Sequence, residues 1–291
     1  MVQYHTYTQN MKKEKMFGVL LGGSFFPFRE LPELFRGPTV DYFFYVSCVV
    51  FVSTRKQIML LLYNEKKRIL SSIFSISMSS PAAVYSLTRV ATFHVPSKTA
   101  FNLIISCGSV VDFSYNSQSS AIVNAANEGC LGGGGVDGAI SNAGGPTLLN
   151  DRMNLPQLET GVRCRTGSAV LTGPNSYGSL RVPYVIHAVG PNYLQYDTDE
   201  EMSRGDELLS SAYLTSLECG KSQNLESIAF ALLSAGIFRG KRSVNDVLRI
   251  GIEAICKFDG YPSLQEVHLC AFNQNEADTL IRVATSMGLS E

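Results

Sequence analysis

The sequence of 291 residues contains no tryptophan, only four histidines, and seven cysteines of which no two are spaced as C-x-x-C. A structural zinc site needs clustered cysteine and histidine ligands, so this composition argues against one, and we expect no bound metal. An odd number of scattered cysteines indicates free thiols in a reducing compartment. We therefore expect an intracellular protein, cytoplasmic or nuclear.

An excess of charge of one sign is also lacking, because 24 basic residues stand against 25 acidic ones. This balance excludes a whole-surface basic footprint for nucleic acid. The longest apolar run, residues 42–53, has 12 residues, whereas a membrane-spanning helix needs about 20. The length allows one or two domains with a core that needs no disulfide or metal.

The charge is distributed unevenly along the chain. Up to Ser77 there are 10 basic and 5 acidic residues, whereas from Met78 onward there are 14 and 20. The first stretch also shows no clear helix or strand period. We expect residues 1–84 to be an N-terminal extension without a stable core, and residues 85–291 to form the globular domain. An organelle address and a membrane-associated segment are alternative interpretations of the extension.

From about residue 89, strand-like segments alternate with helix-like segments. The strand-like segments are short and rich in β-branched and apolar residues: 90–95, 102–106, 121–125, 169–172, 184–189, 228–233 and 267–272. The helix-like segments carry apolar residues at helical spacing: 207–220, which stops at a glycine, 244–258, which follows Ser243 as N-cap, and 275–288. This alternation predicts an α/β fold, a mixed sheet covered by helices on both faces.

The most informative stretch is N-A-A-N-E-G-C-L-G-G-G-G-V-D-G-A-I at residues 124–140. A buried strand is expected to end at Ala125, and the four glycines that follow lead directly into a predicted helix. Backbone N–H groups at a helix N-terminus bind anions, and glycine leaves them open to approach. The stretch therefore predicts a phosphate or pyrophosphate site.

Two other phosphate loops can be compared with this stretch. A P-loop is excluded because no Lys-Ser/Thr pair follows the glycines. Gly133, Gly135 and Gly138 match G-x-G-x-x-G, but about seven residues separate them from the strand, and no strand end supplies the acidic residue of a dinucleotide fold. A nicotinamide-dependent dehydrogenase is therefore a minor alternative.

Residues 124–140 resemble the signature of the macrodomain family, whose members bind ADP-ribose. Further segments occur in the order of that family: C-R-T-G-S-A at 164–169, V-I-H-A-V-G-P at 185–191, and S-I-A-F and S-A-G-I-F at 227–230 and 234–238. The resemblance spans roughly residues 89–285. It implies a three-layer α/β/α sandwich with a ligand cleft at the carboxyl ends of the strands.

The resemblance also assigns roles to individual residues. Asn127 and Asp137 would be the catalytic pair, Asn127 on the ribose hydroxyls and Asp137 on an attacking water. Asp112 would replace the acidic adenine contact that Gly108-Ser109-Val110 lacks, and the alternative is that adenine selectivity rests on backbone groups. The implied ADP-ribose contacts are Asp112, Asn124, Gly132, Gly133, Gly134, Gly135, Val136, Ser234, Ala235, Gly236, Ile237, Phe238 and Phe272.

Several of these residues have a purely structural alternative. Phe238, beside the distal ribose, and Phe272, against the adenine, are alternatively core aromatics. Asp137 alternatively only complements the dipole of its helix. His187 lies mid-strand in an apolar run, so we expect a core histidine, and we expect Cys130 to be a small buried filler.

The activity implied by the resemblance is hydrolysis, either removal of mono-ADP-ribose from acidic side chains or deacetylation of O-acetyl-ADP-ribose. The pair Asn127 and Asp137 favours this hydrolase, whereas Ser141 stands where the hydrolytic branch often has a histidine. The alternative is a non-enzymatic reader of ADP-ribosylated proteins. No metal or redox cofactor is implied, and we expect a monomer.

Overall fold

The computed structural model describes residues 87–95 and 97–290, and four short strands nearer the N-terminus. The chain divides into two units, Met1–Ser80 and Pro81–Glu291. In the first unit, the strands form two antiparallel pairs, β1 (Asn10–Met11) with β2 (Glu14–Lys15) and β3 (Gly18–Leu21) with β4 (Ser24–Pro27). The predictions for residues 1–84 fall mostly outside the described residues and stay predictions.

The second unit is built on a seven-stranded sheet with the strand order β5-β6-β11-β10-β7-β9-β8. Its strands are β5 (Thr88–Val95), β6 (Phe101–Cys107), β7 (Ser120–Ala125), β8 (Ala169–Thr172), β9 (Tyr184–Ala188), β10 (Ser227–Ala231) and β11 (Glu266–Ala271). The inner strands pair in parallel, and the edge strands β5 and β8 are antiparallel to their neighbours. Each strand predicted from the sequence is present.

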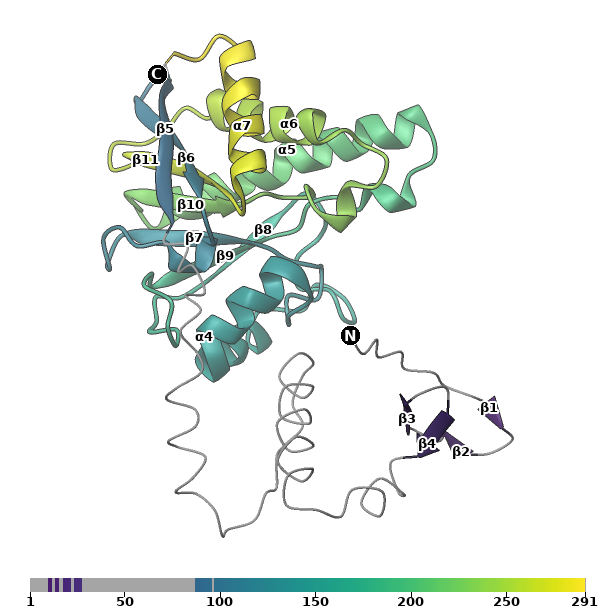
Figure 1. Cartoon of the computed structure of the whole chain (residues 1–291). Helices are drawn as coiled ribbons and strands as arrows, with labels where there is room; N and C mark the ends of the chain where they lie inside the picture. The colour runs from purple at the N-terminus through teal and green to yellow at the C-terminus, as the bar shows by residue number, and fades with distance from the viewer. Residues whose placement is uncertain are drawn as a thin grey trace, which may run out of the picture. The chain divides into compact units, whose positions relative to one another are not determined.

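Helices cover both faces of this sheet. The helices are α4 (Gly135–Met153), α5 (Asp199–Ser222), α6 (Val244–Lys257) and α7 (Gln274–Ser286), with short 3-10 turns η1 (Val110–Asp112), η2 (Tyr193–Gln195) and η3 (Ile237–Arg239). Helix α4 lies on one face, and α5, α6 and α7 lie on the other (Figure 1). The predicted three-layer α/β/α sandwich is therefore confirmed. In the part of the chain that the structure describes, no helix has the length and apolar character needed to cross a membrane.

Helix α5 differs from its prediction at both ends. It begins earlier, because Thr198 and Glu201 form a capping box in which each side chain accepts a hydrogen bond from the other's backbone N–H. The predicted stop at Gly220 is wrong, since the helix continues past it. A Cβ on Gly220 would lie 2.2 Å from Cδ1 of Ile228, so this glycine allows the helix to pack closely on β10 rather than ending it.

Two buried apolar clusters hold the layers together. The larger lies between the sheet and α5, α6 and α7, and the smaller lies between the sheet and α4. Ser243 caps α6 as predicted, because its Oγ accepts a hydrogen bond from Asp246 N at 3.1 Å. Since β6, β7, β10 and β11 run parallel, their carboxyl ends meet at one edge of the sheet. The loops that leave these strands therefore gather there.

Candidate functional site

The glycine loop between β7 and α4 presents unpaired backbone N–H groups. Gly134 is the N-cap of α4 and offers no side chain to cap it. Within the described residues, the N–H groups of Gly133, Gly134, Gly135 and Val136 donate no hydrogen bond. All three glycines are exposed. Free N–H groups at the positive end of a helix dipole form an anion site.

Gly133 lies directly over the buried carboxylate of Asp137. A Cβ at Gly133 would lie 3.0 Å from Asp137 Oδ2 and 3.2 Å from Asn127 Nδ2, whereas a Cβ at Gly134 would meet nothing within 4 Å. Gly135 has φ +59, a conformation that side chains rarely adopt. Glycine is therefore required at Gly133 for space and at Gly135 for backbone conformation.

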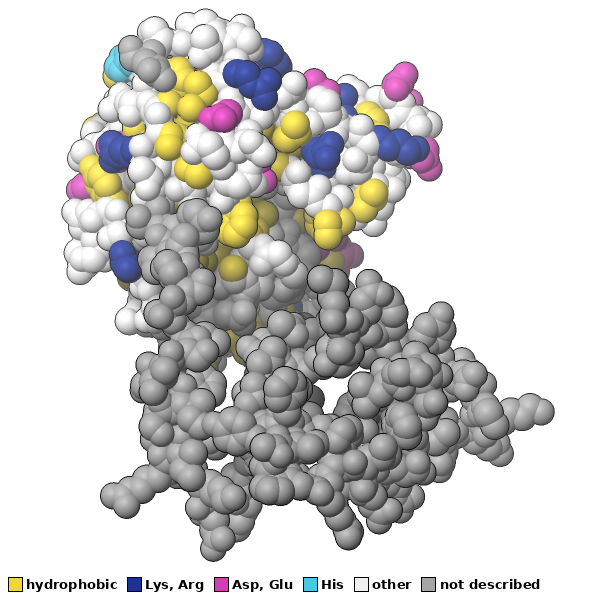
Figure 2. Space-filling view, viewed as in Figure 1, with side chains coloured by type: hydrophobic (Ala, Val, Ile, Leu, Met, Phe, Trp, Pro, Cys, Tyr) yellow, Lys and Arg dark blue, Asp and Glu magenta, His cyan; other side chains and the backbone are white. Residues whose placement is uncertain are grey.

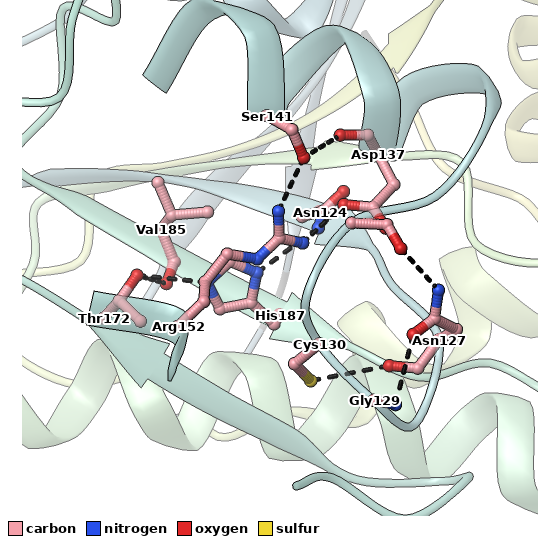
Figure 3. Close-up of polar contacts among 11 residues, drawn as sticks. Asn124, Asn127, Gly129, Cys130, Asp137, Ser141, Arg152, Thr172, Val185 and His187 are labelled. Carbon is pink, nitrogen blue, oxygen red and sulfur yellow. Dashed lines mark hydrogen bonds and ion pairs between the residues drawn. The ribbon is translucent and has the colours of Figure 1, made fainter. Parts of the chain in front are cut away.

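Asn127 holds the loop in shape. Its Nδ2 donates to the carbonyl of Gly132 at 2.9 Å, and its Oδ1 accepts from Gly129 N at 3.1 Å (Figure 3). These bonds use one of its two N–H groups and one of two lone pairs. One donor and one acceptor of the half-buried amide therefore remain for a ligand.

Asp137 lies deeper than the sequence analysis expects of a residue that handles water. Its side chain is 4% exposed and forms an ion pair with Arg152, whose side chain is 1% exposed. Asn124 Nδ2 donates to Asp137 Oδ1 at 2.8 Å. The other oxygen, Oδ2, has no hydrogen-bond partner among the described residues. Asp137 is thus more than a complement to the helix dipole, and its unpartnered oxygen Oδ2 is buried beneath the glycine loop.

Arg152 is the member of this site that sequence reasoning missed. Its Nη1 donates to Ser141 Oγ at 2.7 Å, and Ser141 Oγ donates to the carbonyl of Asp137, also at 2.7 Å. Ser141 therefore accepts a bond from a buried guanidinium at the position where the hydrolytic branch often has a histidine. The sequence carries no local signal for Arg152, because it lies 15 residues from Asp137 along the chain.

A chain of hydrogen bonds continues from Asp137 into the sheet (Figure 3). The amide Nδ2 of Asn124 lies 3.3 Å from His187 Nδ1, and His187 Nε2 lies 3.0 Å from Thr172 Oγ1. Thr172 Oγ1 in turn donates to the carbonyl of Val185 at 3.2 Å. Burial, and secondarily the charge of Arg152, hold the pKa of His187 well below its usual value. His187 is therefore a neutral core histidine, as the sequence analysis expects.

Asn124 requires a correction. The sequence analysis places it among the ligand contacts, but its side chain is fully buried and bonds to Asp137 and His187. Adjacent residues of a strand face opposite sides, and Asn124 faces the α4 side beneath the loop. It therefore positions the carboxylate and does not reach the ligand.

The loop after β10 has the same general design as the glycine loop. Ser234 has φ +53, and its hydroxyl donates to the carbonyl of Pro191 at 2.7 Å. Its side chain is therefore turned inward, and its backbone is left for a ligand, so the predicted contact of Ser234 can be made only through the backbone. The N–H groups of Ala235, Gly236 and Ile237 donate no hydrogen bond within the described residues.

The two predicted aromatic contacts are both exposed. Phe238 in η3 is 40% exposed, and Phe272 after β11 is 74% exposed. The alternative that these are core aromatics is therefore wrong. The N–H of Phe272 donates to Glu276 Oε2 at 2.8 Å, which fixes the start of α7. Both rings are free to cover the faces of a ligand.

The family of the chain follows from comparison with known proteins. The sequence model of the Macro domain matches residues 123–248. A Macro domain-containing protein from Caldanaerobacter subterraneus subsp. tengcongensis is 37% identical over 169 residues, which cover 58% of this chain and 87% of that protein. The chain belongs to the macrodomain family. The resemblance seen in the sequence is therefore confirmed.

Two further relatives of this macrodomain have informative names. The O-acetyl-ADP-ribose deacetylase of Escherichia coli K12 is 34% identical over 168 residues, which cover 57% of this chain and 88% of that protein. A solved structure of the Oceanobacillus iheyensis macrodomain with ADP has a TM-score of 0.56 and 27% identity, and the match covers 68% of this chain and 96% of that one.

The family motifs brace the site of this macrodomain. Glu128 accepts hydrogen bonds from the backbone N and the Oγ1 of Thr166, each at 2.9 Å, which joins the segment 164–169 to the glycine loop. Cys130 is fully buried, as expected of a filler.

Asp112 is not gathered with the two loops. It lines a separate cavity to which neither loop contributes a residue.

Among the described residues, no three His, Cys, Asp or Glu side chains are grouped as a metal site. On the coloured part of the face in Figure 2, basic and acidic side chains lie interspersed among small groups of hydrophobic ones.

Proposed function

We propose that this macrodomain binds ADP-ribose at the carboxyl edge of the sheet. The proposal rests on the free N–H groups of Gly133, Gly134, Gly135 and Val136 at the start of α4. A diphosphate is the part of the ligand that these groups suit best. The Oceanobacillus macrodomain with ADP and the relatives named O-acetyl-ADP-ribose deacetylase support this choice of ligand.

The remaining contacts follow from the exposed groups around this loop. The N–H groups of the second loop, Ala235 to Ile237, would bond the far side of the diphosphate. Phe272 would stack on the adenine, and Phe238 would pack beside the distal ribose. The unused donor and acceptor of Asn127 would bond the ribose hydroxyls.

The proposed reaction is hydrolysis at the distal ribose, of an O-acetyl ester or of a bond to an acidic side chain. Water attacks the ester carbonyl or the anomeric carbon, and Asp137 Oδ2, the oxygen without a partner, orients it and accepts its proton. For the acetyl ester, the bond from the carbonyl carbon to the ribose oxygen breaks and Asp137 returns the proton to that oxygen, which leaves as an alcohol. For the acidic side chain, the bond to the anomeric carbon breaks and the carboxylate leaves without a proton. Because Oδ2 is buried, the glycine loop above it would have to shift for this water to enter.

A non-enzymatic reader of ADP-ribosylated proteins is the second candidate function. The observation that favours it is the ion pair of Asp137 with Arg152, which occupies the carboxylate in a buried position. A reader needs the loops and the aromatic rings to bind the ligand, but it does not need a carboxylate that is free to handle a water.

Titration calorimetry of the purified protein with ADP-ribose and with AMP tests the binding proposal. We expect clearly tighter binding of ADP-ribose, because both loops bind the diphosphate. Equal affinities would show that only the adenine end is recognised, and the assignment of the loops would be wrong.

Turnover assays on O-acetyl-ADP-ribose and on a mono-ADP-ribosylated acidic protein separate the two functions. For the hydrolase, Asp137→Asn keeps the volume of the side chain but should lower turnover about 100-fold or more, with ADP-ribose affinity changed little. Because it leaves Arg152 without its partner, circular dichroism must first show that this variant is folded. Asn127→Ala should weaken binding as well. Tight binding without turnover on either substrate supports the reader, and Ser141→His is then the first substitution to try.

A further inference from the structure

A second cluster of polar side chains lies on β6 and β11, apart from the glycine loop and the loop after β10. Ser106 Oγ lies 3.0 Å from His268 Nδ1, and His268 Nε2 lies 3.0 Å from Glu266 Oε2. Arg89 Nη2 donates to the same carboxylate at 2.5 Å. Ser106 and His268 are buried, and the ring of Phe113 packs edge-on against His268 at 5.0 Å.

The charges of the cluster determine the direction of its hydrogen bonds. The bonds from His268 and then from Arg89 lower the pKa of Glu266, so this carboxylate is ionised at neutral pH and only accepts. Burial lowers the pKa of His268, so the ring is neutral. Nε2 of His268 therefore carries the proton that faces Glu266, and Nδ1 presents a lone pair to the hydroxyl of Ser106. This is the nucleophile, base and orienting carboxylate of an activated serine.

The cluster borders a cavity large enough for a small ligand. The cavity has a volume of about 260 Å³, and beside Ser106 and His268 its polar lining is Arg89, Asp112, Ser114, Tyr115 and Arg181. The backbone N–H groups of Ser114 and Tyr115 donate no hydrogen bond within the described residues. Among those same residues, the guanidinium of Arg181 forms no ion pair. The cavity thus offers free donors and the unpaired charge of Arg181, and its two arginines outnumber its one carboxylate, Asp112.

We propose that Ser106, His268 and Glu266 form a second reactive site, which cleaves small carboxylic esters that carry an anionic group. It lies outside the proposed ADP-ribose site, because no residue of either loop lines the cavity. Arg181 would bind the anionic group, and the N–H groups of Ser114 and Tyr115 are the available donors to the carbonyl oxygen as it becomes negative.

The proposed step proceeds through an acyl-serine. Ser106 Oγ forms a bond to the carbonyl carbon while its proton passes to His268 Nδ1. The bond from that carbon to the alcohol oxygen then breaks, and His268 returns the proton to the departing oxygen. A water then loses a proton to the same nitrogen and forms a bond to the acyl carbon. The bond from that carbon to Ser106 Oγ breaks, His268 returns the proton to Oγ, and the carboxylic acid is released.

Labelling of the full chain with a fluorophosphonate, a reagent that modifies activated serines, tests this site. We expect one adduct, which peptide mass spectrometry places on Ser106. His268→Gln should slow the labelling about 100-fold or more, since it removes the base. Ser109→Ala is the matched control, because Ser109 belongs to the neighbouring turn and its side chain makes no cap bond there. It should be labelled at the wild-type rate.

A second assay tests the ester class directly. Hydrolysis of 4-nitrophenyl acetate is compared with that of the mono-4-nitrophenyl ester of glutaric acid, and we expect a preference for the glutarate that Arg181→Gln abolishes. If Ser106 of the wild-type chain carries no adduct, the proposal is wrong, and no variant is needed to show it. A wild-type labelling rate in a folded His268→Gln chain would also overturn it, since Ser106 would then not depend on the histidine.

Discussion

Replacing Arg152 by methionine provides the sharpest test of how the proposed site is built. The side chains of Arg152 and Asp137 are 1% and 4% exposed, so neither charge is hydrated in the folded state. Removing one partner of a buried ion pair leaves the other charge uncompensated and costs about 3–5 kcal/mol. Methionine has a similar length, so little of this cost comes from a cavity. In addition, Ser141 Oγ loses the hydrogen bond that it accepts from Arg152.

The measurements are thermal unfolding, which gives Tm, and chemical unfolding, which gives the free energy of unfolding, both followed by far-ultraviolet circular dichroism because the chain has no tryptophan. For a domain of this size, 1 kcal/mol corresponds to about 2–4 °C in Tm, so the expected fall is about 6–20 °C. Arg165→Met is the matched control, since Arg165 forms an exposed ion pair with Glu159 at 3.4 Å. Such pairs contribute about 0–1 kcal/mol.

A double variant separates the lost charge from lost packing. Adding Asp137→Asn to Arg152→Met removes the orphaned charge, so the double variant should be more stable than Arg152→Met alone by more than about 1 kcal/mol. The reasoning is wrong if the free energy of unfolding of Arg152→Met lies within about 1 kcal/mol of the wild-type value. It is also wrong if adding Asp137→Asn lowers that free energy further.

Three further outcomes follow from the geometry of the described residues. Gly133→Ala should lower the free energy of unfolding by about 1–3 kcal/mol, because its Cβ would crowd the carboxylate at 3.0 Å, whereas Gly134→Ala has open space and should not. Phe272→Ala should weaken ADP-ribose binding by about 1–3 kcal/mol without changing Tm, since the ring is 74% exposed, and unchanged affinity would contradict its stacking role. Between pH 7 and pH 5 the wild-type Tm should fall, because below about pH 6.5 the unfolded chain binds a proton at His187 that the folded chain excludes. The Tm of His187→Gln should fall less over this pH range. The Tm of the exposed control, His94→Gln, should fall as much as that of the wild type.

The elements of the fold were predictable because their signals are local. Alternation of strand-like and helix-like segments follows from side-chain periods of about 2 and 3.6 residues, which are properties of the sequence itself. The glycine loop was predictable for the same reason, because a buried strand, four glycines and a helix start are contiguous in the chain. The end of α5 was not predictable, because Gly220 serves close packing against Ile228 of β10 and does not end the helix.

The sequence by itself thus determined the strands of the sheet and the position of the glycine loop, whereas the contacts of Asp137 were decided by tertiary structure. Asp137 and Arg152 are 15 residues apart, a distance of about 22 Å along a straight helix. Their ion pair forms because α4 breaks at Gly145, whose φ is +62, and the chain turns back. Ser106 and His268 are 162 residues apart and meet only because β6 pairs with β11. Such contacts depend on how separate elements pack, and no period or motif within either segment records that packing.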